Sequence, residues 1–152
     1  MRSAADFNLF YKSPDPRHIS RAKFRDKVLR HWLSELVRGQ TVLELGCGEG
    51  HLTQAVFGEA KSVTGIDISD VAIDRARSRK INNAKFVQSD FLQAPFEGYD
   101  VITAIECLYY LSSAEQNEFF VKIAREHAGK TFLLSAPSSE RTNSIATLPT
   151  MN

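Results

Sequence analysis

Cysteine is scarce in this chain of 152 residues, which contains only Cys47 and Cys107. Two cysteines are too few for the disulfide framework of a small secreted domain. Cys47 falls in a glycine-rich loop and Cys107 in a predicted core region, so we expect two free thiols in a reducing compartment. The first ten residues, MRSAADFNLF, lack the apolar core of a signal peptide. These absences favour a cytoplasmic location.

An excess of one charge and long apolar runs are also missing. The chain has 19 lysine and arginine residues against 18 aspartate and glutamate residues, and its net charge is +1. No basic run is dense enough for a nucleic-acid-binding patch, and no apolar run is long enough to cross a membrane. The four histidines are scattered, without the spacing of metal ligands. The sequence therefore predicts no nucleic-acid partner, no membrane span and no metal site.

The composition and the pattern of apolar residues are those of one α/β domain. Hydrophobic residues make up 43% of the chain and charged residues 24%, which is ordinary for a globular protein. Strands are expected at 41–45, 62–66, 85–88, 101–105 and 131–135, and helices at 19–38, 50–58, 70–79 and 114–127. Apolar strands that alternate with helices predict a doubly wound parallel sheet, which binds ligands at the carboxyl ends of its strands.

The most informative segment, residues 41–53, reads TVLELGCGEGHLT. A short apolar run reaches Glu44 and opens into Gly46, Gly48 and Gly50 just before a predicted helix. Glycines at this spacing let a ligand approach the main chain closely. The free N–H groups at the start of the helix favour a carboxylate or another anion. The pattern is typical of a loop that binds a nucleoside cofactor.

The spacing of this loop separates two classes of cofactor. A dinucleotide-binding loop has the pattern Gly-x-Gly-x-x-Gly with an acidic residue about 20 positions further on, whereas His51 stands here in place of the last glycine. The acidic residue is nevertheless present, because Asp67 ends the second predicted strand and can accept hydrogen bonds from both hydroxyls of a ribose. The sequence favours a nucleoside without a pyrophosphate, and a nicotinamide-dependent oxidoreductase is the weaker interpretation.

Three features occur in order along the chain: the loop Glu44–Gly50, Asp67, and the pair Asp90–Phe91 after the third strand. Together they resemble the class I methyltransferases that depend on S-adenosylmethionine, over residues 41–137. The resemblance implies a Rossmann-like fold, S-adenosyl-L-methionine as cofactor and S-adenosyl-L-homocysteine as product. It also implies these cofactor-binding residues: Glu44, Gly46, Cys47, Gly48, Gly50, Asp67, Ile68, Asp90, Phe91 and Ile105.

The resemblance assigns these residues to parts of the cofactor. Asp67 would hold the ribose and Asp90 the exocyclic amine of adenine, while Ile68 and Phe91 would pack on the adenine faces. The glycine loop would hold the methionine end, and Glu106 would lie beside the transferred methyl group. Methyl transfer from a sulfonium is an in-line displacement with a neutral leaving group, so alignment can supply much of the acceleration. A base is needed only if the acceptor carries a proton at the wrong time.

The segment Glu106–Leu111, ECLYYL, resembles the region after the fourth strand in the nodulation N-methyltransferases, which methylate an amino sugar of a chitooligosaccharide. Glu106, Tyr109 and Tyr110 are the resulting catalytic candidates. Two aromatic rings beside a carboxylate suit a sugar or a cationic amine, because the rings offer stacking faces and the carboxylate can orient an amine or accept its proton. We therefore expect a methyltransferase enzyme with a small-molecule acceptor, an amine or an amino sugar.

Simpler structural roles are open for the same residues. Asp67 can end a strand or help to cap the next helix, and Asp90 can belong to a turn. Either Tyr109 or Tyr110 can be a core aromatic residue. His51 begins a predicted helix, where we expect a local structural role or a contact at the rim of the site, and it is left out of the catalytic set.

Residues 138–152, SSERTNSIATLPTMN, are polar, whereas the resembled family continues after its fifth strand with a helix and an antiparallel pair of strands. We therefore expect a sheet shortened at this pair. Three parts follow: a flexible arm or lid at 1–18, the cofactor-binding domain at 19–137 and a polar tail at 138–152.

Three explanations are open for such a shortened sheet: a natural minimal form, a fragment of a longer protein, or a homo- or hetero-oligomer in which a partner covers the sheet edge. The alternative function is a non-catalytic cofactor-binding or partner subunit that lacks a complete acceptor pocket.

Overall fold

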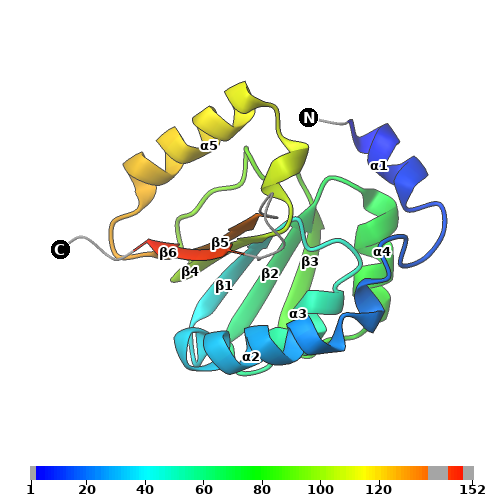
Figure 1. The fold of residues 1–152 in the computed structure, drawn as a ribbon, viewed down its shortest axis with the longest axis horizontal. Coiled ribbons are helices and arrows are strands. Elements are labelled where there is room, and N and C mark those ends of the chain that lie inside the picture. Colours follow the sequence, from blue (N-terminus) through cyan, green and yellow to red (C-terminus); the bar gives the residue numbers. More distant parts are fainter. Residues whose placement is uncertain (1–2, 137–143, 149–152) are drawn as a thin grey trace.

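The computed structural model describes residues 3–136 and 144–148 and contains one six-stranded sheet in the order β3-β2-β1-β4-β5-β6 (Figure 1). Its strands are β1 (Thr41–Leu45), β2 (Ser62–Asp67), β3 (Ala84–Gln88), β4 (Val101–Ile105), β5 (Thr131–Ala136) and β6 (Ser144–Leu148). Strands β1 to β5 are parallel, and β6 runs antiparallel to β5. The strand order reverses between β1 and β4, and the carboxyl ends of strands at such a point form a binding crevice.

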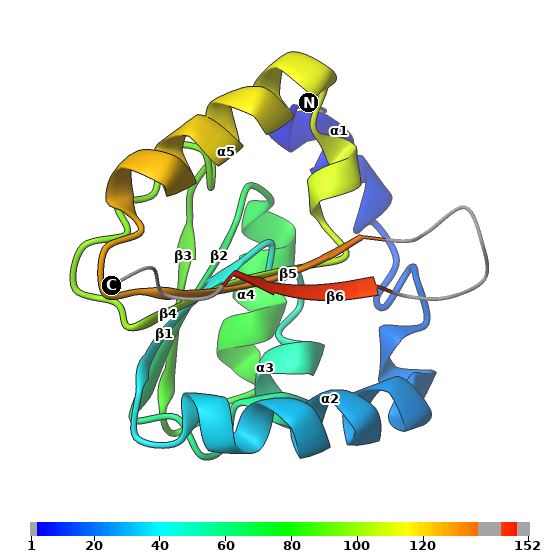
Figure 2. The same ribbon diagram turned by 60° about the vertical axis from the view of Figure 1, so that its left-hand side comes forward.

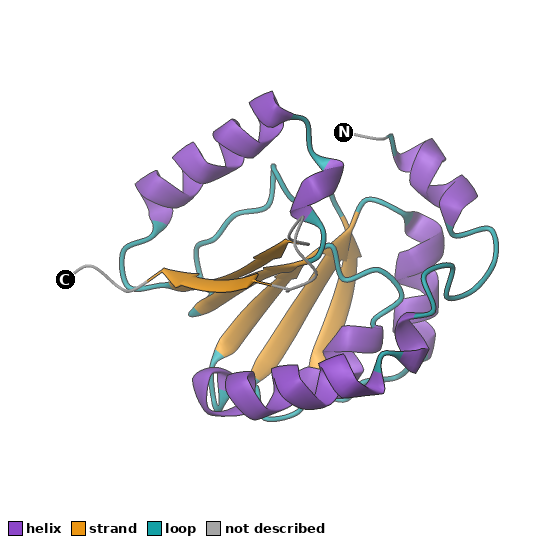
Figure 3. Cartoon of the chain, in the orientation of Figure 1, coloured by secondary structure: helices purple, strands orange, loops and turns teal. Residues whose placement is uncertain are grey.

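Helices lie on both faces of the sheet, as Figures 2 and 3 show. Those in the described residues are α1 (Ala4–Phe10), α2 (Lys23–Val37), α3 (His51–Val56), α4 (Asp70–Ser78) and α5 (Ser113–Glu126). Two short 3₁₀ turns occur at Ile19–Arg21 and Leu108–Tyr110. None of these helices is long and apolar enough to span a membrane.

Each face of the sheet has its own apolar core. Leu29, Leu33 and Val37 of α2 are buried in one cluster with residues of β1, β2, β4 and β5. Phe119 and Ile123 of α5 belong to a second cluster on the other face. Because both faces are covered, the central strands are buried along most of their length instead of alternating between buried and exposed residues. The doubly wound parallel sheet predicted from the sequence is confirmed.

The first helix of the domain is shorter than predicted. Periodicity indicated one helix over residues 19–38, but α2 begins at Lys23. Ile19–Arg21 forms a separate 3₁₀ turn, in which the N–H of Ala22 donates to the carbonyl of Ile19. The five predicted strands lie within a residue of their predicted bounds at both ends. The pattern of apolar residues thus located the elements better than their ends.

The predicted N-terminal arm, residues 1–18, contains a helix in its described part. Residues 4–10 form α1, which begins with a capping box in which Ser3 and Asp6 satisfy each other's backbone N–H groups. Phe7 of this helix is buried, and its ring meets the ring of Tyr110 edge to face at 5.2 Å. The arm is therefore a packed part of the fold.

The predicted polar tail, residues 138–152, contributes one strand to the sheet. Within the residues predicted as a polar tail, Ser144–Leu148 forms β6 and pairs with β5 from Phe132 to Ala136. The sheet consequently gains one antiparallel strand beyond β5. Residues 137–143 and 149–152 of the predicted tail lie outside the described residues, and coverage of the sheet edge by a partner stays a prediction.

Candidate active site

An open cleft lies at the carboxyl ends of β1, β2, β3 and β4. All the site residues predicted from the sequence line the cleft except Gly50 and Tyr109. The fold therefore gathers residues from four separate strand ends at one place, while their individual roles stay predictions.

The glycine loop turns at the floor of the cleft through left-handed residues. Gly46, Gly48 and Gly50 have φ angles of 70°, 53° and 75°. A Cβ atom on Gly46 would lie 2.9 Å from Cβ of Cys107, and one on Gly48 would lie 2.8 Å from the hydroxyl of Tyr11. Backbone conformation and close packing both require glycine at these two positions. Gly50 instead begins α3 and packs against α4 and β3.

Asp67 ties the end of β2 to the glycine loop. Its carboxylate accepts hydrogen bonds from the backbone N–H of Gly48 at 3.0 Å and of Ser69 at 2.9 Å. Burial raises the pKa of this carboxyl above its usual value, although these two hydrogen bonds oppose the shift. The cap of α4 is the hydroxyl of Ser69, which accepts from the N–H of Ala72. Asp67 is thus free of the capping role that the sequence left open.

Glu44 lies beneath the loop with 3% of its surface exposed. The hydroxyl of Thr53 on α3 donates a hydrogen bond to its carboxylate. Burial raises the pKa of Glu44 from 4.5 to about 8, and the nearby Asp67 adds to the rise. Glu44 therefore holds α3 against β1 as well as lining the cleft.

The apolar wall of the cleft is formed by Ile68, Phe91 and Ile105, next to the polar Asp90. The Asp90 carboxylate accepts the N–H of Leu92 at 2.9 Å, which is the turn contact that the sequence left open. A turn contact and a cleft-lining position are compatible, because a carboxylate has further lone pairs to offer a ligand.

Glu106 follows β4 in a backbone conformation that is uncommon for a residue with a side chain, with φ at 52°. Its N–H is held by the carbonyl and the hydroxyl of Ser135, at 3.2 and 3.1 Å. Its carboxylate lies 3.7 Å from Nη1 of Arg25 on α2. Strained residues of this kind cluster at functional sites, where the surrounding structure holds them in place.

Tyr109 and Tyr110 form a pair with ring centres 4.4 Å apart. Tyr110 lines the cleft and contacts Phe7 of α1, whereas Tyr109 is 37% exposed and does not line it. Burial of part of its ring, together with the hydrogen bond to Tyr110, raises the pKa of Tyr109. Of the two, Tyr110 is the one placed to contact a ligand.

The N-terminal arm supplies a wall that the predicted site did not include. Phe7, Tyr11, Asp15 and Arg17 of the arm line the cleft, and so does Ile19 just after it. Burial raises the pKa of Tyr11 well above its ordinary value, and the charge of Asp67 adds to this. The aromatic residues of the arm were the available signal in the sequence.

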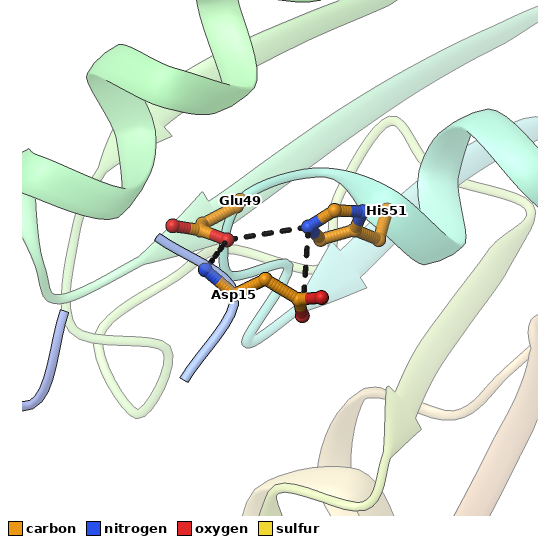
Figure 4. A group of neighbouring side chains, drawn as sticks. All are labelled: Asp15, Glu49 and His51. Atoms are coloured by element: carbon orange, nitrogen blue, oxygen red, sulfur yellow. Dashed lines mark hydrogen bonds and ion pairs between the residues drawn. The ribbon is translucent and has the colours of Figure 1, made fainter. Parts of the chain in front are cut away.

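A charged cluster joins the arm to the glycine loop, as Figure 4 shows. The N–H of Asp15 donates to the carboxylate of Glu49 at 2.8 Å, and Nε2 of His51 lies 3.2 Å from the same carboxylate and 3.8 Å from that of Asp15. Glu49 is almost fully buried and also pairs with Arg75 of α4 at 2.6 Å. The guanidinium of Arg79 bonds the ring of His51.

The side chains of Asp15, Glu49 and His51 are close enough to hold a metal ion. The positive charge beside Glu49 is, however, already supplied by Arg75. The geometry is that of a structural connection between the arm, the glycine loop and α4, and it places His51 at the rim of the cleft. The two cysteines are buried free thiols.

Comparison with known proteins places these features in a family. The family described as "Methyltransferase domain" matches residues 42–127, which is more than half of the chain. Nodulation protein S of Azorhizobium caulinodans is 32% identical over 108 residues, which cover 67% of this chain and 52% of that protein. A ubiquinone biosynthesis O-methyltransferase of Nitrosomonas europaea is 30% identical over 92 residues, 53% of this chain and 38% of that protein. The chain spans about half the length, or less, of these relatives.

Solved structures show the same fold. A phosphoethanolamine N-methyltransferase of Haemonchus contortus, with phosphoethanolamine and S-adenosylhomocysteine, superposes with a TM-score of 0.74 at 20% identity, over 90% of this chain and 32% of that one. The N-methyltransferase NodS of Bradyrhizobium japonicum, with S-adenosylhomocysteine, gives a TM-score of 0.60 at 24% identity, over 84% of this chain and 64% of that one. From the matched residues 42–127 and this shared fold, the chain belongs to the methyltransferase domain family.

Proposed function

We propose that this chain binds S-adenosyl-L-methionine and transfers its methyl group to a small-molecule acceptor, an amine or an amino sugar. The observation that carries the proposal is the convergence of the glycine loop, Asp67, Asp90 and Glu106 on one cleft. Membership of the methyltransferase domain family supports the same reaction.

The residues present fit this cofactor. Asp67 uses one N–H bond on each carboxylate oxygen, and each oxygen keeps a lone pair that can accept a ribose hydroxyl. Gly46 and Gly48 line the cleft with main-chain atoms alone, and these atoms can contact the methionine part. The apolar side chains of Ile68 and Phe91 offer surfaces for an adenine ring. The cleft thus has a polar place for the sugar and an apolar place for the base.

When bound, S-adenosyl-L-methionine supplies an electrophilic methyl group on a sulfonium. The residues of the chain would align the acceptor with it, which is the main requirement of a displacement with a neutral leaving group. Glu106 would orient the acceptor amine and take up its proton, and Arg25 at 3.7 Å would hold the Glu106 carboxylate in place. Phe7 and Tyr110 would close the cleft against water on the side of the arm.

The amine or amino sugar is proposed from Glu106 and the adjacent tyrosines, and the resemblance to Nodulation protein S supports it. The alternative of a non-catalytic subunit was based on a missing wall of the acceptor pocket. Phe7, Tyr11 and Arg17 of the arm line the cleft, which favours an enzyme. A cytoplasmic location is proposed from the two free thiols.

Transfer of labelled methyl groups tests the reaction. The chain is incubated with S-adenosylmethionine carrying a labelled methyl group and with a panel of amines and amino sugars, and the products are separated by chromatography. The proposal expects at least one labelled amine, and loss of labelling in Glu106→Ala. Labelling only on hydroxyl oxygens of the amino sugars would contradict the amine assignment.

A further inference from the structure

Arg17 places a guanidinium at the mouth of the cleft, between the arm and the segment after β4. Its Cζ atom lies 5.4 Å from the ring centre of Tyr109 and 5.8 Å from that of Tyr110. Its Nη1 donates to the main-chain carbonyl of Glu106 at 3.5 Å. Stacking on two aromatic rings holds a guanidinium in place while its N–H groups remain available.

Arg17 differs from the nearby Arg25 in its ion pairs. Arg25, the other arginine that lines the cleft, pairs with Asp26 at 2.7 Å and with Glu106 at 3.7 Å. Among the residues that the structure describes, Arg17 forms no salt bridge. A guanidinium in a cleft without a carboxylate partner is suited to an anion from a ligand.

The backbone around Arg17 is fixed in an unusual shape. Asp15 and His18 both have left-handed backbones, with φ angles of 49° and 53°. The N–H of His18 donates to the carbonyl of Asp15 at 2.9 Å, while the Asp15 N–H donates to the buried Glu49. The Asp15 carboxylate accepts from the N–H and the hydroxyl of Ser20. The turn is held from both sides, so Arg17 is positioned before a ligand arrives.

We propose that Arg17 binds an anionic group of the methyl acceptor, a carboxylate or a phosphate, while Glu106 faces the acceptor amine. The proposal rests on the proposed function and narrows it to small zwitterionic amines. Carboxylate and phosphate both match the fork of N–H donors on a guanidinium. Opposite charges on Arg17 and Glu106 would select an acceptor that carries both an amine and an anionic group over an amine without an anionic group. The carboxylate of the cofactor has the same chemistry, so the test must separate the two.

The test is a titration of the chain, saturated with S-adenosylhomocysteine, with 2-aminoethylphosphonate and with ethanolamine, followed by ligand-observed NMR. Wild type, Arg17→Gln and Arg21→Gln are compared, because Arg21 lies on the same segment but does not line the cleft. The expected result is that wild type and Arg21→Gln bind the phosphonate about tenfold more tightly than ethanolamine, as a charge-assisted hydrogen bond would give. Arg17→Gln should lose this preference and keep its affinity for S-adenosylhomocysteine.

Equal binding of the two amines by wild type, or binding of neither, would overturn the proposal. A loss of S-adenosylhomocysteine affinity in Arg17→Gln, as large as its effect on the phosphonate, would assign Arg17 to the cofactor carboxylate and would overturn it too. If wild type fails to bind S-adenosylhomocysteine at all, the proposed function itself fails. If wild type binds S-adenosylhomocysteine but shows no preference for the phosphonate, the role of Arg17 is refuted and the proposed function is not.

Discussion

Replacement of Asp67 by alanine should weaken binding of S-adenosylhomocysteine without unfolding the chain. Asp67 is 8% exposed and lines the cleft. Loss of hydrogen bonds to the ribose should raise the free energy of binding by about 1 to 3 kcal/mol, or about 5-fold to 150-fold in Kd. Asp67→Asn keeps one carbonyl oxygen as an acceptor and should give a smaller loss.

The assay is calorimetric titration of wild type, Asp67→Ala and Asp67→Asn with S-adenosylhomocysteine. Asp74→Ala is the control, because Asp74 is a carboxylate on α4 whose side chain is 75% exposed and pairs with Arg77 at 3.3 Å. Thermal unfolding of each variant shows that the fold is retained, since Asp67 also accepts the N–H groups of Gly48 and Ser69.

The expected order of Kd is Asp67→Ala above Asp67→Asn above wild type, with Asp74→Ala equal to wild type. A folded Asp67→Ala variant that binds as tightly as wild type would refute the assignment of Asp67 to the ribose. An equal loss in Asp74→Ala would show that the effect is a general one of charge.

Three further predictions concern other carboxylates. Burial raises the pKa of Glu44 from 4.5 to about 8. The stability that its neutral form contributes is therefore fully present below pH 4.5 and is lost as the pH rises through 8. Glu44→Gln should flatten this fall in the free energy of unfolding, measured by urea titration at each pH, and an unchanged slope would contradict the prediction. Glu106→Ala should leave the Kd for S-adenosylhomocysteine unchanged and lower methyl transfer, whereas a large loss of binding would place Glu106 at the cofactor. Glu49→Gln should speed hydrogen exchange at residues 4–18, because Glu49 holds the arm at Asp15; the exposed control Glu59→Gln should not, and equal exchange in both would refute this connection.

The cleft could be predicted because its main residues are set by local rules. Glycines that end an apolar strand and an acidic residue at the end of the next strand are readable from spacing alone. Parallel strands place their carboxyl ends at the same edge of the sheet, so Gly46, Asp67 and Glu106 lie near one another independently of the loop conformations. This is the part of the site that the sequence located.

The arm could not be predicted in the same way. Phe7 packs against Tyr110, about a hundred positions further along the chain, and Tyr11 fills space above Gly48 that exists only once the loop has turned. Arg75 reaches Glu49 through tertiary packing of α4. Such contacts depend on the assembled fold, and two prolines in a short segment indicated flexibility instead.

The strand β6 was missed for a different reason. The segment SIATL lies within a polar stretch and is short. Its place in the sheet comes from backbone pairing with β5, from Phe132 to Ala136. Backbone pairing leaves little trace in a pattern of side chains, so the segment gave no periodic signal.

The most direct test of the central claim is calorimetric titration of the wild-type chain with S-adenosylhomocysteine and, separately, with NADH. The glycine loop, with His51 in place of a third glycine, and Asp67 at the end of β2 predict one-to-one binding of S-adenosylhomocysteine and none of NADH. Binding of NADH without binding of S-adenosylhomocysteine would contradict the account.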